Sequence, residues 1–580
     1  MCSIIVIFNE SNPAILRAMA EAIRHRGPDS FEVWENGRHG IAACRLSIFG
    51  DSDAPMIYTD PESGHTVLLN GEIYNYEDLW QELTDQGIQR SSNLEAELID
   101  RLFVLYGLDF ARHLKGMFAV AILDGDRLVL ARDRFGIKPL YYAKSGRKII
   151  VSSEIKGILR HSQVSPILNR GALEETRVFG YMIDQEATFF EGIHQIHPGA
   201  VVAFSESGSV ENRRFGVFPQ AVYLNGNGHP DYEEACIQVR TRVIQAVENM
   251  FRHGKMEKGI YLSGGVDSST IALVASRLLG YPVQTFTLTD SGENPDFQAA
   301  RRVSKALGTK HHEYFTTVED YWCAVPDYMA HYESLMAGGV FHIQGGIAFH
   351  LLSRRIAENV RVAFSGEGAD ELFGGYYWIY THPLGFSDRI RQNLKEIPPN
   401  DRMADYVNRL FPEPEDERIY RRNLFDHLVG AGLSNYHLQS VDRSAGAFGF
   451  EIRPLYLDDD LSQYAMALPI EYKVPDKKTT KMILKDAFRK DFEDAGIRWV
   501  HERLKMGMPS AISSIDKDIE RQVAAAVSDA ELKKHPLGGI LGSKMNLLLY
   551  DLFEHLFFKG WDHREPCPPE NSLLARVWPE

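Results

Sequence analysis

Residues 259–269 read Gly-Ile-Tyr-Leu-Ser-Gly-Gly-Val-Asp-Ser-Ser, and their pattern indicates the fold of the second half of the chain. Its first four residues have the short apolar pattern of a strand, and apolar residues recur at helical spacing from Ile271 to Leu278. Glycines at such a turn let backbone N–H groups approach an anion, and the dipole of the following helix favours negative charge. No Gly-Lys-Ser/Thr word follows, so the chemistry of Walker-type loops is not indicated. The stretch predicts a strand–turn–helix unit that holds a pyrophosphate.

A second turn of the same kind is predicted at Ser365-Gly-Glu-Gly-Ala-Asp-Glu371, which follows the alternating strand pattern Val360–Phe364. Open α/β sheets bind ligands at the carboxyl ends of their strands, so both turns are expected at one edge of a sheet. Asp267 and Asp370 would then face one triphosphate. Because two carboxylates repel a nucleotide unless a cation lies between them, the sequence predicts Mg²⁺ at these two residues.

The periodicity of the sequence divides the chain into two domains. From Tyr232 onward strands alternate with helical patterns, which predicts a parallel α/β sheet. Through Phe204, short strands separated by turn signals indicate an α+β domain. Between these regions the composition shifts to Pro, Asn, Gly and His, and the periodicity disappears. We therefore predict domains at residues 2–210 and 232–580, joined by a linker at residues 211–231.

Cys2 is the first residue of the chain once Met1 is removed. A thiol that carries its own α-amino group has a base beside the nucleophile and needs no separate histidine. Such a pair is suited to amide hydrolysis. With a nucleotide site on the same chain, the released nitrogen can be transferred to an activated carboxylate.

Composition excludes several classes of protein. At 580 residues the chain is too long for one core, and at least two domains are expected. The formal net charge of −16 disfavours a nucleic-acid partner, because phosphate binding needs a basic surface. The cysteines lie far apart without metal-ligand spacing, so they predict neither a disulfide framework nor a zinc site. No apolar run is long enough to span a bilayer and no signal peptide is recognised, which predicts a cytoplasmic protein without a membrane partner.

Further short motifs in both halves of the chain are similar to those of a known family. Asn70-Gly-Glu-Ile-Tyr-Asn75 offers an amide and a backbone N–H to an oxyanion, and Arg45 can hold a carboxylate through two hydrogen bonds. With Cys2 and Arg24-His-Arg-Gly-Pro-Asp29 they resemble the class II glutamine amidotransferase domain. Ser263–Ser269 resembles the signature of PP-loop ATP pyrophosphatases. From Cys2 to about Pro509 the chain therefore resembles the glutamine-hydrolysing asparagine synthetase family, and the matching words also include Ser153-Glu154 and Arg503-Leu-Lys505.

The resemblance implies a fold and a set of roles. The fold is an N-terminal nucleophile hydrolase αββα sandwich, followed by a PP-loop, Rossmann-like α/β domain with a mostly helical C-terminal part. Cys2 would attack the side-chain amide of glutamine, and ammonia would pass through an internal tunnel to a carboxylate that MgATP has adenylated. A homodimer is also expected from the resemblance.

The implied site residues fall into four groups. The catalytic residues are Cys2, Asn70, Gly71 and Lys481. The glutamine-binding residues are Arg45, Ile48, Asn70, Gly71, Glu72 and Asn93. The ATP-binding residues are Leu262, Ser263, Gly264, Gly265, Asp267, Ser268, Ser269, Ser365, Gly366 and Glu367. The Mg²⁺ ligands are Asp267 and Asp370.

One departure from the family pattern concerns the amide donor. Family members generally carry Ser/Thr-Asp-x-Glu where residues 92–95 read Ser-Asn-Leu-Glu, so Asn93 replaces the carboxylate expected to pair with the substrate ammonium. Loss of a charge-assisted hydrogen bond costs ~1.5 to 3 kcal/mol of binding free energy, which is roughly ten- to hundredfold in affinity. Two outcomes stay open, a weaker grip on glutamine or a related amide as the donor.

A second departure concerns the acceptor. Residues 333–347 are glycine-rich and contain no arginine, whereas aspartate-using enzymes of the family carry a threonine- and arginine-bearing segment here. A buried carboxylate without a cationic partner is unfavourable. The acceptor is therefore aspartate or a larger, less polar carboxylic acid. Two other classes are disfavoured, because β-lactam synthetases lack the N-terminal cysteine and tRNA-modifying PP-loop enzymes need a basic surface.

Overall fold

The computed structural model describes residues 2–48, 55–216, 230–252, 257–335, 343–397, 401–503, 511–565 and 567–579. These residues form two compact units. Unit 1 comprises Met1–Leu168, Gln185–Phe218 and Gly446–Glu451. Unit 2 comprises Asn169–Asp184, Pro219–Ala445 and Ile452–Glu580.

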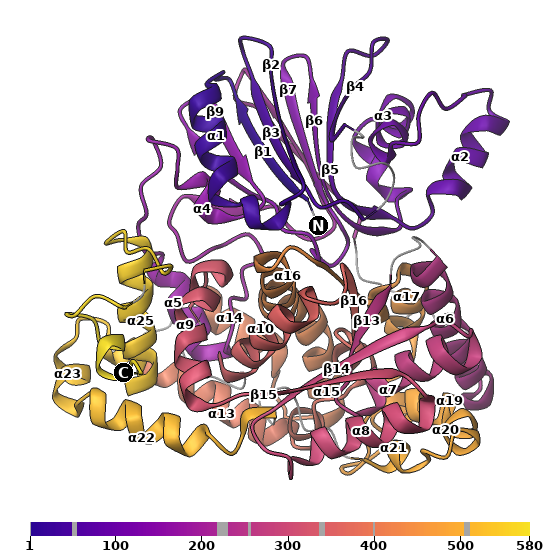
Figure 1. The fold of residues 1–580 in the computed structure, drawn as a ribbon, viewed down its shortest axis with the longest axis vertical. Coiled ribbons are helices and arrows are strands. Elements are labelled where there is room, and N and C mark those ends of the chain that lie inside the picture. Colours follow the sequence, from indigo (N-terminus) through magenta and orange to yellow (C-terminus); the bar gives the residue numbers. More distant parts are fainter. Residues whose placement is uncertain are drawn as a thin grey trace. The chain divides into compact units, whose positions relative to one another are not determined.

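Unit 1 is built on two six-stranded sheets, and many of their strands are labelled in Figure 1. The first sheet has the order β10(Ile193–Gln195), β8(Tyr141–Ser145), β9(Lys148–Ser152), β1(Ser3–Phe8), β3(Gly40–Arg45) and β2(Ser30–Glu35). The second has the order β12(Val210–Arg214), β11(Ala200–Ser205), β7(Arg127–Arg132), β6(Gly116–Asp124), β5(Thr66–Ile73) and β4(Ile57–Thr59). Within the described residues, neighbouring strands of both sheets run antiparallel.

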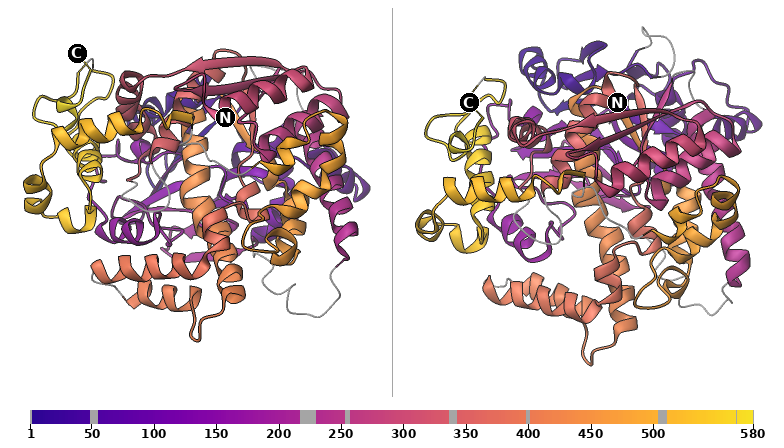
Figure 2. Two further views of the ribbon diagram at one scale, coloured as in Figure 1. Left: turned by 90° about the horizontal axis from the view of Figure 1, so that it is seen from below. Right: turned by 60° about the horizontal axis from the view of Figure 1, so that its bottom comes forward.

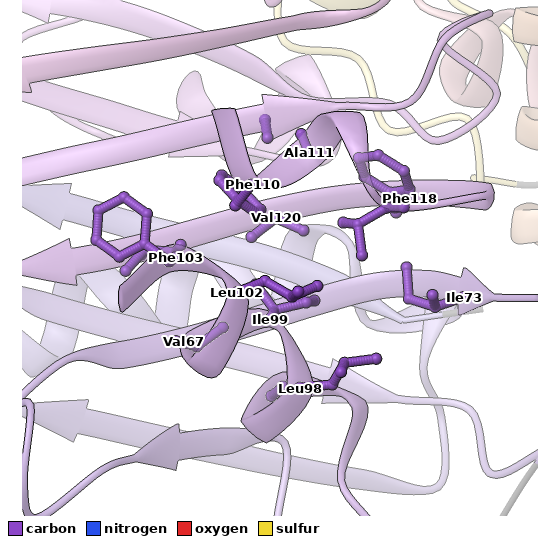
Figure 3. Close-up of a cluster of buried hydrophobic side chains, with 14 of the residues drawn as sticks. Val67, Ile73, Leu98, Ile99, Leu102, Phe103, Phe110, Ala111, Phe118 and Val120 are labelled. Atoms are coloured by element: carbon purple, nitrogen blue, oxygen red, sulfur yellow. The ribbon is translucent and has the colours of Figure 1, made fainter. Parts of the chain in front are cut away.

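Alternating side chains on the strands place a hydrophobic layer on each face of the second sheet. Leu68 of β5 points to the first sheet, where it joins a cluster with Ile4 and Val6 of β1. Its neighbour Val67 points the other way and packs with Leu102 of helix α3, as Figure 3 shows. This alternation follows from the two-residue period of a strand.

Helices cover the outer face of each sheet of unit 1. Helices α1(Pro13–Ala22) and α4(Ile155–Ile158) pack on the first sheet, and α3(Glu95–Tyr106) and η2(Gly107–Arg112) pack on the second. Helix α2(Tyr76–Asp85) contacts α3, and η1(Arg24–Arg26) contacts β3. The four layers confirm the predicted αββα sandwich.

Unit 2 contains a five-stranded sheet, which confirms the predicted Rossmann-like α/β fold (Figure 1). Its order is β15(Lys310–Phe315), β14(Val283–Thr289), β13(Lys258–Tyr261), β16(Val362–Ser365) and β17(Glu451–Pro454). Strand β13 pairs in parallel with β14 on one side and with β16 on the other. The chain therefore reverses its winding direction between β13 and β16, and such a switch point is where open sheets bind ligands.

Helices connect and surround this sheet. The crossover helices are α7(Val266–Leu273), η4(Val274–Leu278), α8(Pro295–Leu307), α9(Val318–Tyr332) and α10(Ile343–Ala357). Most of the remaining chain is helical, as predicted, with elements α5(Arg170–Phe179), α6(Tyr232–Arg252), α11(Ala369–Phe373), α12(Tyr377–Thr381), α13(Pro383–Glu396), α14(Asp401–Leu410), α15(Glu417–His427), η5(Leu428–His437), α16(Leu438–Ala447), η6(Leu455–Leu457), α17(Asp459–Ala467), α18(Ile470–Lys473), α19(Met482–Ala487), α20(Arg489–Asp494), α21(Trp499–Glu502), α22(Asp516–Ala526), α23(Asp529–Lys534), α24(Gly538–Leu541), α25(Lys544–Phe557) and η8(Leu574–Arg576). None of the helices among the described residues has the length and apolar character to cross a membrane.

The unit boundaries differ from the predicted ones in several places, and residues 446–451 cluster with unit 1. Residues 169–184 precede the predicted boundary but cluster with unit 2. Buried Asn435 donates a hydrogen bond to the Met182 carbonyl at 2.7 Å, and Arg177 pairs with Glu396 at 2.9 Å. Strand β12 extends to Arg214, so the first residues of the predicted linker belong to a sheet, and residues 217–229 lie outside the described residues.

Candidate active sites

In unit 1, Cys2 stands immediately before strand β1 and is held by its backbone. Its N–H donates to Asn70 Oδ1 of β5 at 3.0 Å, and its carbonyl accepts from Arg26 Nε at 3.4 Å. Arg26 is fixed in turn by an ion pair with Glu154 at 2.8 Å, and both side chains are fully buried. Cys2 as a residue is partly exposed. These contacts orient its α-nitrogen.

Asn70 and Gly71 form a cradle beside this nitrogen. Asn70 is completely buried, and among the described residues its Nδ2 has no hydrogen-bond partner. A buried donor without a partner costs about 1–3 kcal/mol, so its retention is expected where it binds a ligand. Gly71 has a φ of +142°, and a Cβ there would lie 2.0 Å from the Met117 carbonyl oxygen. Only glycine therefore fits next to the amide donor.

The predicted glutamine-binding residues come from two strands and two loops. Ser3 pairs with Cys44, and extending this register by one residue brings Arg45 beside Cys2. Arg45 and Glu72 are nearly buried, whereas Ile48 is partly exposed. Asn93 is exposed on the loop before α3.

The Asn93 loop is tied to the end of β5. Glu95 accepts the backbone N–H of Ile73 at 2.7 Å, and buried Glu97 accepts from both Ser91 and Ser92. Because Ile73 follows Glu72, this arrangement places the loop at the strand end that carries the predicted binding residues.

Cys2 is supported by three residues, Arg26, His25 and Glu154. They belong to the family words of the sequence, but those words indicate no role for them. His25 lies 3.0 Å from Glu154. Burial is the largest influence on His25 and, despite the nearby carboxylate, lowers its pKa to about 4. The imidazole is therefore neutral near pH 7 and acts as a hydrogen-bonding support.

In unit 2, the turn Ser263–Gly265 connects β13 to the N-terminal end of α7. Gly264 has a φ of +70°, and a Cβ there would lie 2.5 Å from the Ala299 carbonyl carbon. Ser268 Oγ accepts the N–H of Ser263 at 3.2 Å, which closes the turn. The local structure is the predicted strand–turn–helix unit, with the helix N-terminus available to an anion.

Two carboxylates and one ammonium meet beside this turn. Lys481 Nζ lies 2.6 Å from both oxygens of Asp267 and 2.6 Å from Asp370 Oδ1. Lys481 is 2% exposed and precedes α19 with a left-handed φ of +55°. Such strain in a residue other than glycine persists where the surroundings fix it, and it is common at functional sites.

The same carboxylates fit a Mg²⁺ ion. Asp267 and Asp370 come from the ends of different strand–turn units, yet both reach one nitrogen atom. Carboxylate oxygens are the ligands that Mg²⁺ prefers, and it is usually held by one or two of them together with substrate phosphates.

A cavity of about 530 Å³ in unit 2 contains this cluster. The predicted residues on its wall are Leu262, Ser263, Gly265, Asp267, Ser268, Ser365, Gly366, Glu367, Asp370 and Lys481. Gly264 and Ser269 are not on the wall, because Gly264 packs against α8 and Ser269 is fully buried in α7. These two residues support the turn from behind.

The cavity wall also contains polar residues that were not predicted to be functional. Lys485 follows Lys481 by one helical turn, and that spacing could have identified it. The only sequence signal at Arg503 is its place in a family word. In the structure it donates to the Ser263 carbonyl at 3.2 Å and pairs with Asp296. His437 and Tyr376 carry no sequence signal, and Tyr376 donates to Glu371 at 2.6 Å.

One carboxyl group and one amine near the cavity have shifted pKa values. Burial, followed by the charge of Asp370, raises the pKa of Glu371 to about 7. Burial, followed by the charge of Lys481, lowers the pKa of Lys485. An anion bound near Lys485 would favour its charged form and so oppose both influences.

The arginine-free segment predicted to shape the acceptor site is described only at its ends. Glu333 is buried and lies 3.3 Å from Arg443. Gly345 and Gly346, at the start of α10, line the cavity. Residues 336–342 lie outside the described residues, as do Leu504 and Lys505 of the word that begins at Arg503.

Comparison with known proteins finds a matching domain model for each half of the chain and relatives that match over most of its length. The glutamine amidotransferase domain model matches residues 1–215, and the asparagine synthase model matches residues 238–539. Glutamine-hydrolysing asparagine synthetase 3 of Bacillus subtilis is 28% identical over 510 residues, covering 80% of each chain. Glutamine-hydrolysing asparagine synthetase B of Escherichia coli is 27% identical over 591 residues, covering 96% of this chain and 91% of the relative.

Proposed function

The chain belongs to the asparagine synthase family, and from this premise we propose that it forms asparagine from aspartate, glutamine and MgATP. Glutamine is hydrolysed at Cys2, and aspartate is activated as an acyl-adenylate in the cavity of unit 2. The observation that carries the proposal is the meeting of Lys481, Asp267 and Asp370 beside the anion-binding turn. A cation and a pair of metal-binding carboxylates at a helix N-terminus are suited to the cleavage of a triphosphate.

The reaction in unit 1 begins with the Cys2 thiol. The sulfur attacks the side-chain amide carbon of glutamine, and the thiol proton passes to the α-amine of the same residue. Because one N–H of this amine donates to Asn70 Oδ1, its lone pair stays available for the proton. The proton then moves to the amide nitrogen, ammonia leaves, and water hydrolyses the thioester to glutamate. Met1 must be removed for this chemistry, because a peptide nitrogen is not basic.

Binding and charge stabilisation in unit 1 use the surrounding residues. Asn70 Nδ2 and the N–H of Gly71 donate to the oxyanion. Arg45 binds the α-carboxylate of glutamine through two hydrogen bonds. Glu72 and Asn93 bind its α-ammonium, and Ile48 completes the binding surface.

The reaction in unit 2 has two steps. A carboxylate oxygen of aspartate attacks the α-phosphorus of ATP, and pyrophosphate leaves with the electron pair of the broken bond. Ammonia then attacks the acyl carbon, and AMP leaves. The turn Ser263–Gly265 and the start of α7 hold the pyrophosphate, and Lys481 stabilises the charge that develops on it. Bound to Asp267 and Asp370, Mg²⁺ supplies further charge neutralisation.

Lys485 is the group that we assign to the second carboxylate of aspartate. Residues 333–347 contain no arginine for this purpose. Arg503 is already paired with Asp296, and His437 lies 3.6 Å from both Glu367 and Glu371. Lys485 lines the same cavity, and its lowered pKa means that a bound anion would stabilise its charge.

Product analysis tests the proposal. Purified protein is incubated with MgATP and aspartate, with either glutamine or ammonium, beside a Cys2→Ala variant. We expect asparagine from both nitrogen sources in the unmodified protein and from ammonium alone in the variant. If aspartate yields no asparagine while a larger, less polar acid triggers pyrophosphate release, the acceptor is wrong. If Cys2→Ala still uses glutamine, the assignment of unit 1 is wrong.

A further inference from the structure

Three histidines and one aspartate form a cluster in unit 2 away from the cavity. Asp327 and His331 lie on α9, His350 lies on α10, and His563 lies in the segment after α25. Asp327 and His331 are four residues apart, so they share one face of their helix. None of the four side chains lines the cavity that contains Lys481. The proposed reaction therefore does not use them.

The two oxygens of Asp327 have different partners. His331 Nε2 lies 3.5 Å from Oδ1, and His563 Nε2 lies 3.3 Å from the same atom. His350 Nε2 instead donates to Oδ2 at 2.8 Å. His331 and His563 are thus both directed at one oxygen, while the other oxygen is held by an ordinary hydrogen bond.

The two longer separations exceed those of most hydrogen bonds. N–H···O bonds span about 2.7–3.2 Å, which includes the His350 contact but neither of the others. Zn²⁺ takes nitrogen and oxygen ligands at about 2.0–2.2 Å in a tetrahedron, which puts neighbouring ligand atoms roughly 3.3–3.5 Å apart. The ligand atoms of Asp327, His331 and His563 all lie within 4.8 Å of one another.

We propose that Asp327 Oδ1, His331 Nε2 and His563 Nε2 bind one Zn²⁺ ion, with His350 as the positioning residue that orients the carboxylate. Imidazole and carboxylate are common zinc ligands, and three protein ligands leave a fourth position to water. A hydrogen bond to the far oxygen of a ligating carboxylate is the usual outer contact of such sites.

The surroundings of the cluster suit a bound cation. His350 is 2% exposed and Asp327 is 36% exposed, so the site has a buried back and an open side through which an ion can enter.

The proposed ion would attach the C-terminal segment to the core of unit 2. His563 lies beyond residue 539, where the match to the asparagine synthase model ends. The C-terminal helices, yellow in Figure 2, include α25, which contacts α22 and also α9, the helix that carries Asp327 and His331. His350 adjoins Phe349, which lines the ATP-binding cavity. Through His350, the ion would thus also hold α10 next to a residue of the cavity wall.

Zinc binding to the full-length protein, prepared without a histidine tag, tests the proposal. The protein is stripped with a chelator and titrated with ZnCl₂ alone, and bound metal is measured by mass spectrometry. We expect about one tightly bound zinc per chain. His563→Gln and His331→Gln are expected to lose this zinc, whereas the control His194→Ala, which changes an exposed histidine of unit 1, should keep it. We expect His350→Phe to bind roughly 10- to 100-fold more weakly.

Cobalt provides a measurement that does not depend on the folding of a variant. The unmodified protein with Co²⁺ in place of Zn²⁺ should show the intense visible absorption of a tetrahedral site. Circular dichroism verifies that His563→Gln, a change in a partly exposed segment, is folded. Two results would overturn the proposal: no zinc on the unmodified protein at excess metal, or the same zinc content in folded His563→Gln as in His194→Ala.

Discussion

Lys481 Nζ lies 2.6 Å from Asp370 Oδ1, although Lys481 precedes α19 and Asp370 belongs to α11. The ammonium also contacts Asp267, so one buried cation holds two carboxylates that would otherwise repel each other. The left-handed backbone of Lys481 costs of order 1–3 kcal/mol, which is tolerated because this conformation directs the side chain to the cluster.

Replacement of Lys481 should stop synthesis and spare glutamine hydrolysis. For Lys481→Met we expect kcat for asparagine formation to fall by about 10²- to 10³-fold, the usual loss when one transition-state donor is removed. Glutaminase activity of the same preparation, measured as glutamate release, should stay near that of the unmodified protein. Lys478→Met, an exposed neighbour, is the control. An equal loss of both activities would point to misfolding and contradict the assigned role.

Restoring a carboxylate at position 93 should strengthen glutamine binding. Asn93→Asp adds a charge-assisted hydrogen bond to the substrate ammonium, worth about 1.5–3 kcal/mol. We expect KM for glutamine to fall roughly ten- to hundredfold with little change in kcat, because the gain applies to bound substrate and transition state alike. Initial rates over a glutamine series give both constants. An unchanged KM would show that Asn93 does not contact the ammonium.

A side chain at position 71 should disrupt the glutamine site. A Cβ on Gly71 would lie 2.0 Å from a backbone oxygen of β6, so strand β5 must move. We expect Gly71→Ala to abolish glutamine-dependent synthesis while ammonium-dependent synthesis continues. Gly87→Ala is a matched control, since Gly87 also has a positive φ, +87°, but nothing lies within 4 Å of its Cβ. If Gly71→Ala also lost ammonium-dependent synthesis while Gly87→Ala kept it, the separation of the two activities would be contradicted.

Glu371 should make stability depend on pH. Burial and the charge of Asp370 raise its pKa to about 7 in the folded protein, against an ordinary value of 4.5, so folding retains a proton that the unfolded chain releases. The stabilising contribution is complete below pH 4.5 and is lost as the pH rises through about 7. Glu371→Gln removes this loss. We therefore expect the unfolding free energy of the variant, relative to that of the unmodified protein, to be higher at pH 8 than at pH 5 by on the order of 3 kcal/mol.

Denaturant titrations without nucleotide at these two pH values measure the effect of Glu371. Glu471→Gln, on an exposed residue, serves as the control. If the difference between Glu371→Gln and the unmodified protein is the same at both pH values, Glu371 does not titrate in this range.

Local sequence predicted the parts of the fold and sites that depend on neighbouring residues. The turn at Ser263–Gly265 follows from a strand, two glycines and a helical period within a dozen residues. Asp267 and Asp370 were expected to meet because parallel strands bring their carboxyl ends to one edge. The direct contact between Lys481 and these carboxylates was not predicted, because it depends on how a distant helix packs.

Other features had no local signal. Residues 169–184 join unit 2 through contacts such as Asn435 with Met182, which are far apart in the chain. His437 reaches the cavity from the π-helical segment η5, whose position depends on tertiary packing. The Asp327 cluster combines three segments, and only the spacing of Asp327 and His331 could be read from the sequence.

The proposed adenylation is tested most directly by a measurement of the phosphorus products of ATP during glutamine-dependent synthesis. Protein, MgATP, aspartate and glutamine labelled with ¹⁵N in the side-chain amide are combined, and ³¹P spectra are recorded as product forms. We expect AMP and pyrophosphate in amounts equal to the asparagine formed, with the label in its amide. Formation of ADP and inorganic phosphate would contradict it.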